Sequence, residues 1–164
     1  MTITRHRHEV IKGCRKAGIL FQGLFHDLSK FSPAEFIAGV KYYEGYRSPN
    51  AKEREIIGYS AAWMHHKGRN KHHFEYWTDY SPKKRAVVPV EMPRKYLAEM
   101  FCDRVAASKI YKAEAYTDAC PLEYYLAGKD TRQIHPKTAE MLEYFLRLLA
   151  DSGEAATFSE LKEW

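Results

Sequence analysis

Apolar residues recur at intervals of three and four along most of this 164-residue chain, which is the pattern of amphipathic helices. Two four-residue segments have the form of a capping box, in which a first polar residue caps a helix and a later glutamate reaches back. The first is Ser32-Pro33-Ala34-Glu35, with Pro33 at the first helical position, and the second is Asn50-Ala51-Lys52-Glu53. The second box precedes a single helix that we expect to run towards Trp63 and His65.

Prolines mark further helix starts in the second half of the chain. Pro93 is expected to open a long helix through Ile110, and Pro136 opens another that Gly153 closes. Thr157-Phe158-Ser159-Glu160 indicates a last short turn. The chain is therefore expected to be mainly helical at its C-terminal end, with helices over 121–164.

Strand alternation is weak. The only β-like run is Ala86-Val87-Val88-Pro89-Val90, which a proline interrupts, so we expect an extended connector. Residues 67–92 have little helical periodicity and are rich in basic residues, histidines and aromatics, which predicts one long irregular loop of a kind that is often functional. The predicted fold is all-α, a compact helical bundle forming one domain over residues 1–164.

Composition and charge limit the expected cellular compartment and the kinds of ligand. No segment approaches the roughly 18 apolar residues of a membrane span, and the first residues lack an apolar signal segment. The three cysteines form no C-x-x-C pair, as expected of free thiols in a cytoplasmic protein. A net charge of +5 favours anionic ligands, either nucleic acid or a small phosphorylated molecule.

His26 and Asp27 offer a nitrogen and an oxygen donor to one divalent cation. His8 lies 18 positions earlier, which on one straight helix would separate the two histidines by about 27 Å. A chain reversal near Gly18 would bring them together. A shared metal site therefore predicts a helical hairpin in this segment.

Asp103 interrupts an otherwise mostly apolar helix face. Tyr96, Met100, Ala107 and Ile110 share that face at spacings of three and four. An unpaired carboxylate buried there would be costly, so Asp103 is expected to meet a cation, a basic side chain or a helix N-terminus.

The order His8, His26-Asp27, Asp103 on a helical chain resembles the H…HD…D pattern of the HD superfamily of metal-dependent phosphohydrolases. The resemblance covers about residues 6–110. It implies a bundle of the HD-domain type in which His8, His26, Asp27 and Asp103 hold one divalent ion of manganese, iron, cobalt, nickel, zinc or magnesium. It also implies a metal-activated water that attacks phosphorus.

The chain is most similar to a small bacterial family of uncharacterised HD-like proteins, through segments resembling residues 26–31 and 68–73. Asp27-Leu28-Ser29-Lys30 also resembles the HD-I-G-K element of cyclic-dinucleotide phosphodiesterases, but their Gly-Tyr-Pro element is missing. The interval from His8 to His26 is shorter than in most HD proteins, and His6 is an alternative first ligand. On a helix His6 and His8 point apart.

Two double histidines, His65-His66 and His72-His73, extend the pattern. Some HD proteins insert two such histidines before the last aspartate and hold two metals, so His72 or His73 could serve a second metal or the substrate. Neighbouring side chains on a helix diverge by about 100°, and we expect one histidine of each pair to face inward. His65 or His66 is assigned a catalytic role beside Asp27.

Lys30, Lys67 and Arg69 are candidates to bind substrate phosphate, although a solvated basic loop explains the last two equally well. The aromatics Phe74 to Trp77 could stack on a base but more often pin such a segment to a core.

The leading hypothesis is metal-dependent hydrolysis of a nucleotide or another small phosphoester. One alternative is a di-iron oxygenase of the HD type. Another is a non-catalytic nucleic-acid-binding protein that uses its basic loop. A homodimer is compatible with the sequence, and no membrane partner is expected.

Overall fold

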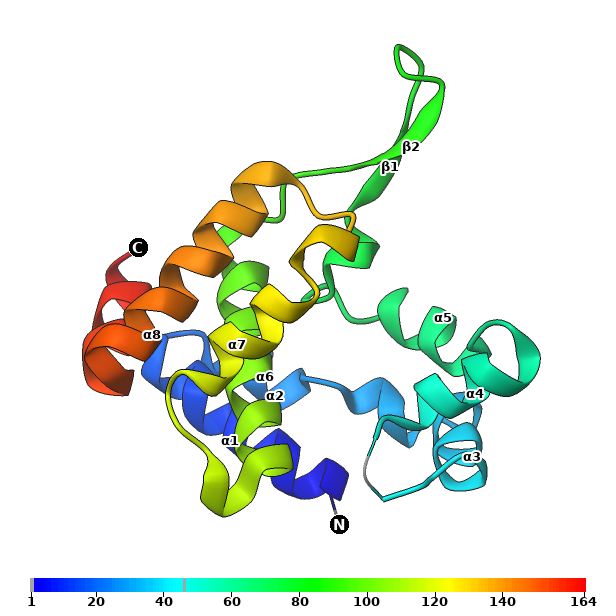
Figure 1. Cartoon of the computed structure of the whole chain (residues 1–164), viewed down its shortest axis with the longest axis horizontal. Helices are drawn as coiled ribbons and strands as arrows, with labels where there is room; N and C mark the ends of the chain where they lie inside the picture. The colour runs from blue at the N-terminus through cyan, green and yellow to red at the C-terminus, as the bar shows by residue number, and fades with distance from the viewer. Residues whose placement is uncertain (1, 46) are drawn as a thin grey trace. The chain divides into compact units, whose positions relative to one another are not determined.

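Most of the chain is helical in the computed structural model, which describes residues 2–45 and 47–164 (Figure 1). The predicted mainly-α class is therefore confirmed. The chain folds into two compact units, which are described separately. The first unit combines the segment ending at His26 with His72–Trp164, and the second consists of Asp27–Lys71.

The first unit begins with a helical hairpin. Helix α1 (Thr2–Lys16) is followed by α2 (Leu20–Phe25), and Gly18 turns the chain with a left-handed φ of +75° that favours glycine. The two helices pack closely at Gly23, where an added Cβ would lie 2.7 Å from the Cβ of Cys14. The reversal that a shared metal site requires is thus confirmed.

Helix α6 (Arg94–Lys112) is the central element of the first unit, and it packs against α1, α7 (Cys120–Ala127) and α8 (Pro136–Glu163). Its N-cap is Pro93, as predicted. The core between these helices is fully apolar at its centre and includes Val10, Phe101, Leu142, Phe145, Leu146 and Leu149.

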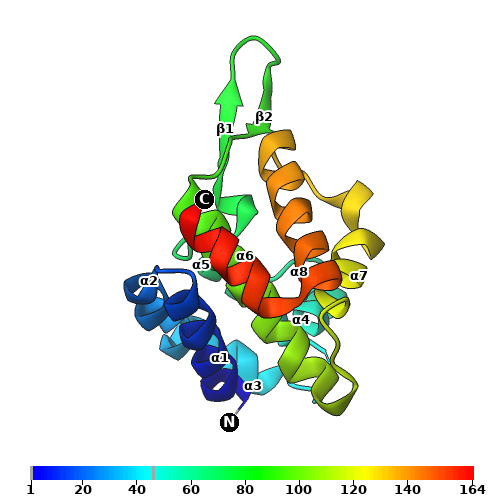
Figure 2. The same ribbon diagram turned by 90° about the vertical axis from the view of Figure 1, so that its left-hand side faces the viewer.

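Helix α8 changes direction at Gly153, whose φ of +76° and ψ of 177° are not helical. The predicted helix end at this glycine is therefore a break between two helical segments. The second segment lies across α6 (Figure 2), where the Phe158 ring packs edge-on against Phe101 with centroids 5.8 Å apart. Residues 157–160, predicted as a short turn, belong to this segment.

The predicted irregular loop at 67–92 contains a β-hairpin, which the sequence reading missed. Strand β1 (Thr78–Ser81) pairs antiparallel with β2 (Ala86–Pro89), and Tyr80 faces Val87 across the pair. Pro89 did not prevent pairing because it ends its strand, where proline is tolerated. Short 3₁₀ turns complete this unit at Phe74–Tyr76, Ala113–Ala115 and Lys129–Thr131.

The second unit contains the 3₁₀ turn η1 (Leu28–Phe31) and the helices α3 (Pro33–Lys41), α4 (Pro49–Ile57) and α5 (Ala61–Lys67). The single helix expected from residue 51 to His65 is two helices. Gly58 ends α4 with a left-handed φ of +86°, and the Ser60 side chain caps α5 by accepting a hydrogen bond from the Trp63 amide over 2.9 Å.

Both predicted capping boxes start helices close to the expected places, but their glutamates do not cap. Neither Ser32 nor Ser48, the observed N-caps, makes a side-chain capping bond. Glu53 instead accepts a hydrogen bond from the Ser60 hydroxyl inside the unit. The role of Glu35 is described with the site.

Among the described residues, no helix combines the length and the apolar character that a membrane crossing needs. The expectation of a single domain over residues 1–164 remains a prediction.

Candidate metal centre

Two carboxylates project from the same face of α6, one helical turn apart. Glu99 is buried, and the side chain of Asp103 is 19% exposed. Both lie in the first unit, where histidines from three other segments surround them. These histidines are His6 on α1, His26 at the C-cap of α2, and His72, which follows the second unit in the chain.

Glu99 holds two of the three histidines. Its Oε1 accepts a hydrogen bond from Nδ1 of His26 over 3.0 Å and lies 3.1 Å from Nδ1 of His72. The two imidazole rings lie side by side with centroids 4.3 Å apart. Burial raises the pKa of Glu99, but the hydrogen bonds from His26 and His72 outweigh it and hold that pKa below its ordinary value. Glu99 is therefore an anion that fixes both rings.

Asp103 lies close to the Nε2 atoms of all three histidines. Its Oδ1 lies 2.9 Å from Nε2 of His6 and 3.5 Å from Nε2 of His26, and its Oδ2 lies 4.0 Å from Nε2 of His72. Burial alone would raise the pKa of Asp103. Hydrogen bonding and positive charge from His26 and His6 instead keep that pKa well below its ordinary value.

This arrangement fits a metal ion. A histidine that donates through Nδ1 presents a lone pair at Nε2 when it is neutral, so Glu99 selects the tautomer that coordinates metals through Nε2. Ligand atoms of a tetrahedral ion with bonds of about 2.1 Å lie roughly 3.4 Å apart, and the distances from Oδ1 of Asp103 to Nε2 of His6 and of His26 bracket that value. His72 lies nearer the other carboxylate oxygen, at 4.0 Å. Three imidazoles and one carboxylate suit zinc, iron or manganese better than magnesium, which prefers oxygen donors.

The first histidine of this cluster is His6, which corrects the assignment of His8. The two residues are two positions apart on α1, so they point to nearly opposite sides of the helix. His6 is buried against Asp103, whereas the side chain of His8 is exposed. The predicted joining of His26 with Asp103 is observed.

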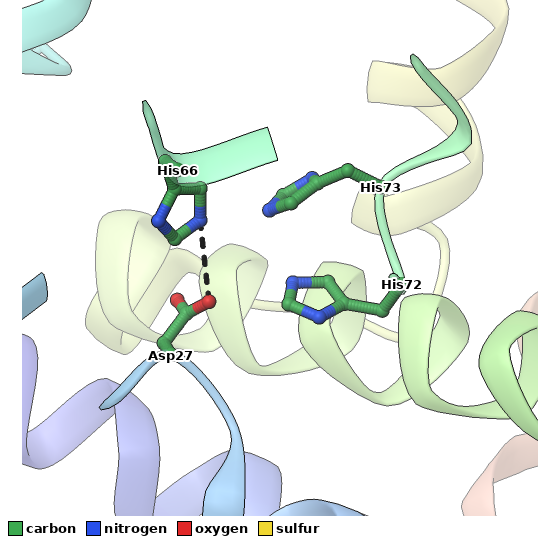
Figure 3. A group of neighbouring side chains, drawn as sticks. All are labelled: Asp27, His66, His72 and His73. Carbon is green, nitrogen blue, oxygen red and sulfur yellow. Dashed lines mark ion pairs between the residues drawn. The ribbon is translucent and has the colours of Figure 1, made fainter. Parts of the chain in front are cut away.

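Asp27 follows His26 by one peptide bond but belongs to the second unit. Its backbone is left-handed, with φ of +54°, a conformation that aspartate tolerates better than most residues. Within the unit its Oδ2 binds Nζ of Lys30 at 2.5 Å, and its Oδ1 lies 3.2 Å from Nε2 of His66 (Figure 3). The division between the units thus falls inside the His-Asp dipeptide.

Glu35 joins both histidines of the first pair, which replaces its predicted capping role. Its Oε1 lies 2.7 Å from Nδ1 of His65, and its Oε2 lies 2.7 Å from Nδ1 of His66. Burial raises the pKa of Glu35, yet the hydrogen bonds from His66, Ser29 and His65 lower it below the ordinary value. His66 is buried as expected of one inward-facing histidine, whereas the side chain of His65 is 23% exposed although it also contacts Glu35.

His66 therefore lies between two carboxylates, with Nδ1 on Glu35 and Nε2 on Asp27. Burial lowers the pKa of His66, but the hydrogen bonds to Asp27 and Glu35 outweigh it and raise that pKa above its ordinary value. Asn70 closes the same cluster, because its side-chain amide donates to the Ser29 hydroxyl over 2.7 Å and to the His66 carbonyl over 2.8 Å. These bonds pin the two ends of the second unit together.

The other predicted phosphate-binding residues do not gather at either cluster within their own unit. Arg69 is exposed and donates to the carbonyl of His65 over 3.3 Å, and Lys67 is half-buried in the last turn of α5. His73 is half-buried beside His72, with ring centroids 4.1 Å apart (Figure 3). Phe74 and Trp77 pack against the core of the first unit, so these aromatics pin the segment as expected.

Two members of the clusters were missed or misassigned from sequence. Glu99 lies four residues before Asp103 and so shares its helix face. Glu35 was assigned to a local capping box because its true partners are some 30 residues away along the chain. A second carboxylate at i−4 from a buried aspartate is the pattern that could have found Glu99.

Fold and site together define a mainly α-helical protein with a buried histidine–carboxylate cluster on its central helix. The chain belongs to DUF5662, described as a family of unknown function, whose model matches residues 1–148. No curated protein and no solved structure is significantly similar to it. The matched region includes every residue of both clusters.

Proposed function

We propose that this protein is a metal-dependent phosphohydrolase of the HD type that acts on a nucleotide or another small phosphoester. His6, His26, His72 and Asp103 would hold one divalent ion. The observation that carries the proposal is the convergence of three Nε2 atoms on Asp103, with Glu99 bound to the far side of two of the rings.

Glu99 supports a metal site because it orients two of the candidate histidine ligands. Metal-binding histidines commonly donate their second ring nitrogen to a carboxylate, which sets the tautomer and the direction of the ring. One glutamate here does so for two histidines at once. A protonated histidine between two carboxylates has the same geometry, as His66 does, so the support for a metal lies in three histidines meeting one carboxylate.

When bound, a divalent ion neutralises phosphate charge and lowers the pKa of a coordinated water. Side chains of the protein would bind this ion and orient its ligands. Asp103 and the three histidines would hold the ion, and Glu99 would keep the rings of His26 and His72 in place. The cluster combines nitrogen and oxygen donors, as the HD resemblance implies.

Within the second unit taken by itself, His66 is the candidate for proton transfer. Its Nδ1 is fixed by Glu35, so its Nε2 is the position from which a proton would move. Asp27 and Glu35 stabilise the protonated ring, and Lys30 balances the charge of Asp27. His65 would have a supporting role through its bond to Glu35.

The test is hydrolysis of p-nitrophenyl phosphate and of a panel of nucleoside monophosphates by protein reloaded with manganese, iron, cobalt, nickel, zinc or magnesium. We expect turnover with at least one metal, loss of turnover with chelator, and loss in Asp103→Asn. His8→Ala is the matched control and should retain turnover. Metal binding without hydrolysis of any phosphoester would contradict the enzymatic part of the proposal.

The same experiment separates the alternatives. Two irons per chain together with oxygen uptake would favour a di-iron oxygenase and contradict the hydrolase. Salt-sensitive binding to oligonucleotides that chelator leaves unchanged, with no turnover, would favour a nucleic-acid-binding protein.

A further inference from the structure

A cavity of about 450 Å³ lies in the first unit, apart from the candidate metal ligands. It is formed by α1, α6 and the final segment of α8. This volume is in the range of small-molecule sites.

Basic side chains dominate the rim. Lys12, Arg15 and Lys16 come from α1, Lys109 comes from α6, and two carboxylates, Glu9 and Glu154, accompany them. Four cationic and two anionic side chains leave an excess of two positive charges. That excess matches a phosphate monoester, which carries a charge of about −1.5 to −2 at pH 7.

The carboxylate of Glu154 already binds two lysines of the rim, which indicates where an anionic group of a ligand would bind. It binds Nζ of Lys16 at 2.7 Å and also binds Lys109. Lys12 is paired with Glu9 at 2.6 Å, but Arg15 has no ion-pair partner within the described part of the chain. An incoming anion would pair with Arg15 and compete with Glu154 for the two lysines.

The floor of the cavity is apolar. It is formed by Gly13, Cys102, Val105, Ala106 and Phe158. Gly13 permits close packing at the floor, because a Cβ at this position would lie 3.3 Å from Cβ of Cys102 and 3.6 Å from the Phe158 ring. Glycine inside a helix costs about 1 kcal/mol relative to alanine, so its presence here has a packing reason.

We propose that this cavity binds a small amphiphilic phosphate, with the phosphate on the Arg15–Lys16 rim and a short apolar body on the Gly13–Cys102 floor. The site does not depend on the proposed phosphohydrolase activity. None of its lining residues belongs to the candidate metal cluster. The ligand would occupy it with or without metal.

The test is calorimetric titration of the chelator-treated full chain with butyl, hexyl and octyl phosphate below their micellar concentrations. We expect one ligand per chain and an affinity that rises up to about tenfold for every two carbons added. Octanoate, with one charge, should bind more weakly than octyl phosphate. Inorganic phosphate should bind weakest of all.

Variants with opposite expected effects make the test specific. Arg15→Gln and Lys16→Gln should each weaken octyl phosphate at least fivefold, whereas Glu154→Gln should strengthen it because a competing carboxylate is gone. Lys137→Gln, an exposed lysine elsewhere on α8, is the matched control and should have no effect. Amide shifts in NMR spectra should map binding to Gly13 and Cys102.

Several results would overturn the site: no saturable binding, an affinity independent of chain length, tighter binding of octanoate, or equal losses in Lys137→Gln and Lys16→Gln. Loss of binding in Asp103→Asn would show that the ligand occupies the metal cluster instead. Thermal melting of each variant confirms that the comparison is made between folded proteins.

Discussion

Oε1 of Glu99 accepts a hydrogen bond from Nδ1 of His26 over 3.0 Å. The contact turns Nε2 of the same ring towards Asp103, one turn further along α6. Glu99 therefore orients His26 and His72, two of the four candidate metal ligands, and is not itself one of the four.

Glu99→Gln is expected to weaken metal binding by about 10- to 100-fold, because a glutamine cannot hold two Nδ1–H groups as an anion does. The measurement is a metal titration by calorimetry on protein stripped with chelator. Glu91→Gln is the control, since Glu91 is more than half exposed and pairs only with Lys137 among the described contacts. An unchanged metal affinity in Glu99→Gln would show that Glu99 does not orient the metal ligands.

His6→Ala and His8→Ala form a matched pair on one helix. The first should abolish stoichiometric metal binding, because it removes the imidazole 2.9 Å from Asp103. The second should leave metal binding unchanged, because the His8 side chain is exposed. Metal content of the two purified proteins, measured by mass spectrometry of the elements, is the readout. A loss in His8→Ala alone would restore the assignment made from sequence.

His66 is expected to titrate above its ordinary pKa of 6.5 in metal-free protein, because Asp27 and Glu35 stabilise the charged ring despite its burial. A raised folded-state pKa means that this ring adds stability below about pH 6.5, and that the contribution is lost as pH rises through the folded-state pKa. NMR titration of the ring protons measures the midpoint. Glu35→Gln should lower that midpoint, and a midpoint at or below 6.5 in the unmodified protein would contradict the two-carboxylate arrangement.

Glu154 should stabilise the first unit through Lys16 and Lys109. Burial raises the pKa of Glu154, but hydrogen bonds from Lys109 and Lys16 lower it below 4.5. The stabilisation is therefore full above about pH 4.5 and is lost as pH falls through the lowered folded-state pKa. Glu154→Gln should cost about 0.5–1 kcal/mol in the free energy of unfolding at pH 7, and the difference should shrink in acid.

Urea unfolding from pH 3 to pH 7 measures this difference. Glu163→Gln, near the exposed end of the same helix, is the control and should show little effect at any pH. A cost for Glu154→Gln that persists undiminished in acid would show that the carboxylate charge is not its source.

Local signals in the sequence predicted the helices well. Pro33, Pro93 and Pro136 stand at helix starts because proline lacks the amide hydrogen that a first turn leaves unused. The turn at Gly18 followed from the need to bring two distant histidines together. The break at Gly58 was missed because helical periodicity continues across it.

Contacts between residues distant in the sequence account for the remaining differences between the expected and the observed structure. Glu35 satisfied a local capping pattern, but packing places it on His65 and His66. His6 and His8 differ only in the side of α1 that they occupy, which the approach of α6 decides. The β-hairpin was missed because two strands of four residues carry too little alternation to be recognised.

We propose that His6, His26, His72 and Asp103 hold one divalent metal ion, and every other prediction about the first unit's cluster follows from this. The most direct test of this proposal is the metal stoichiometry of untagged protein, measured by elemental mass spectrometry before and after reloading and compared with Asp103→Asn. We expect one ion per chain in the natural protein and none in the variant, with both proteins folded. Absence of bound metal after reloading with each candidate ion, together with no thermal shift, would contradict it.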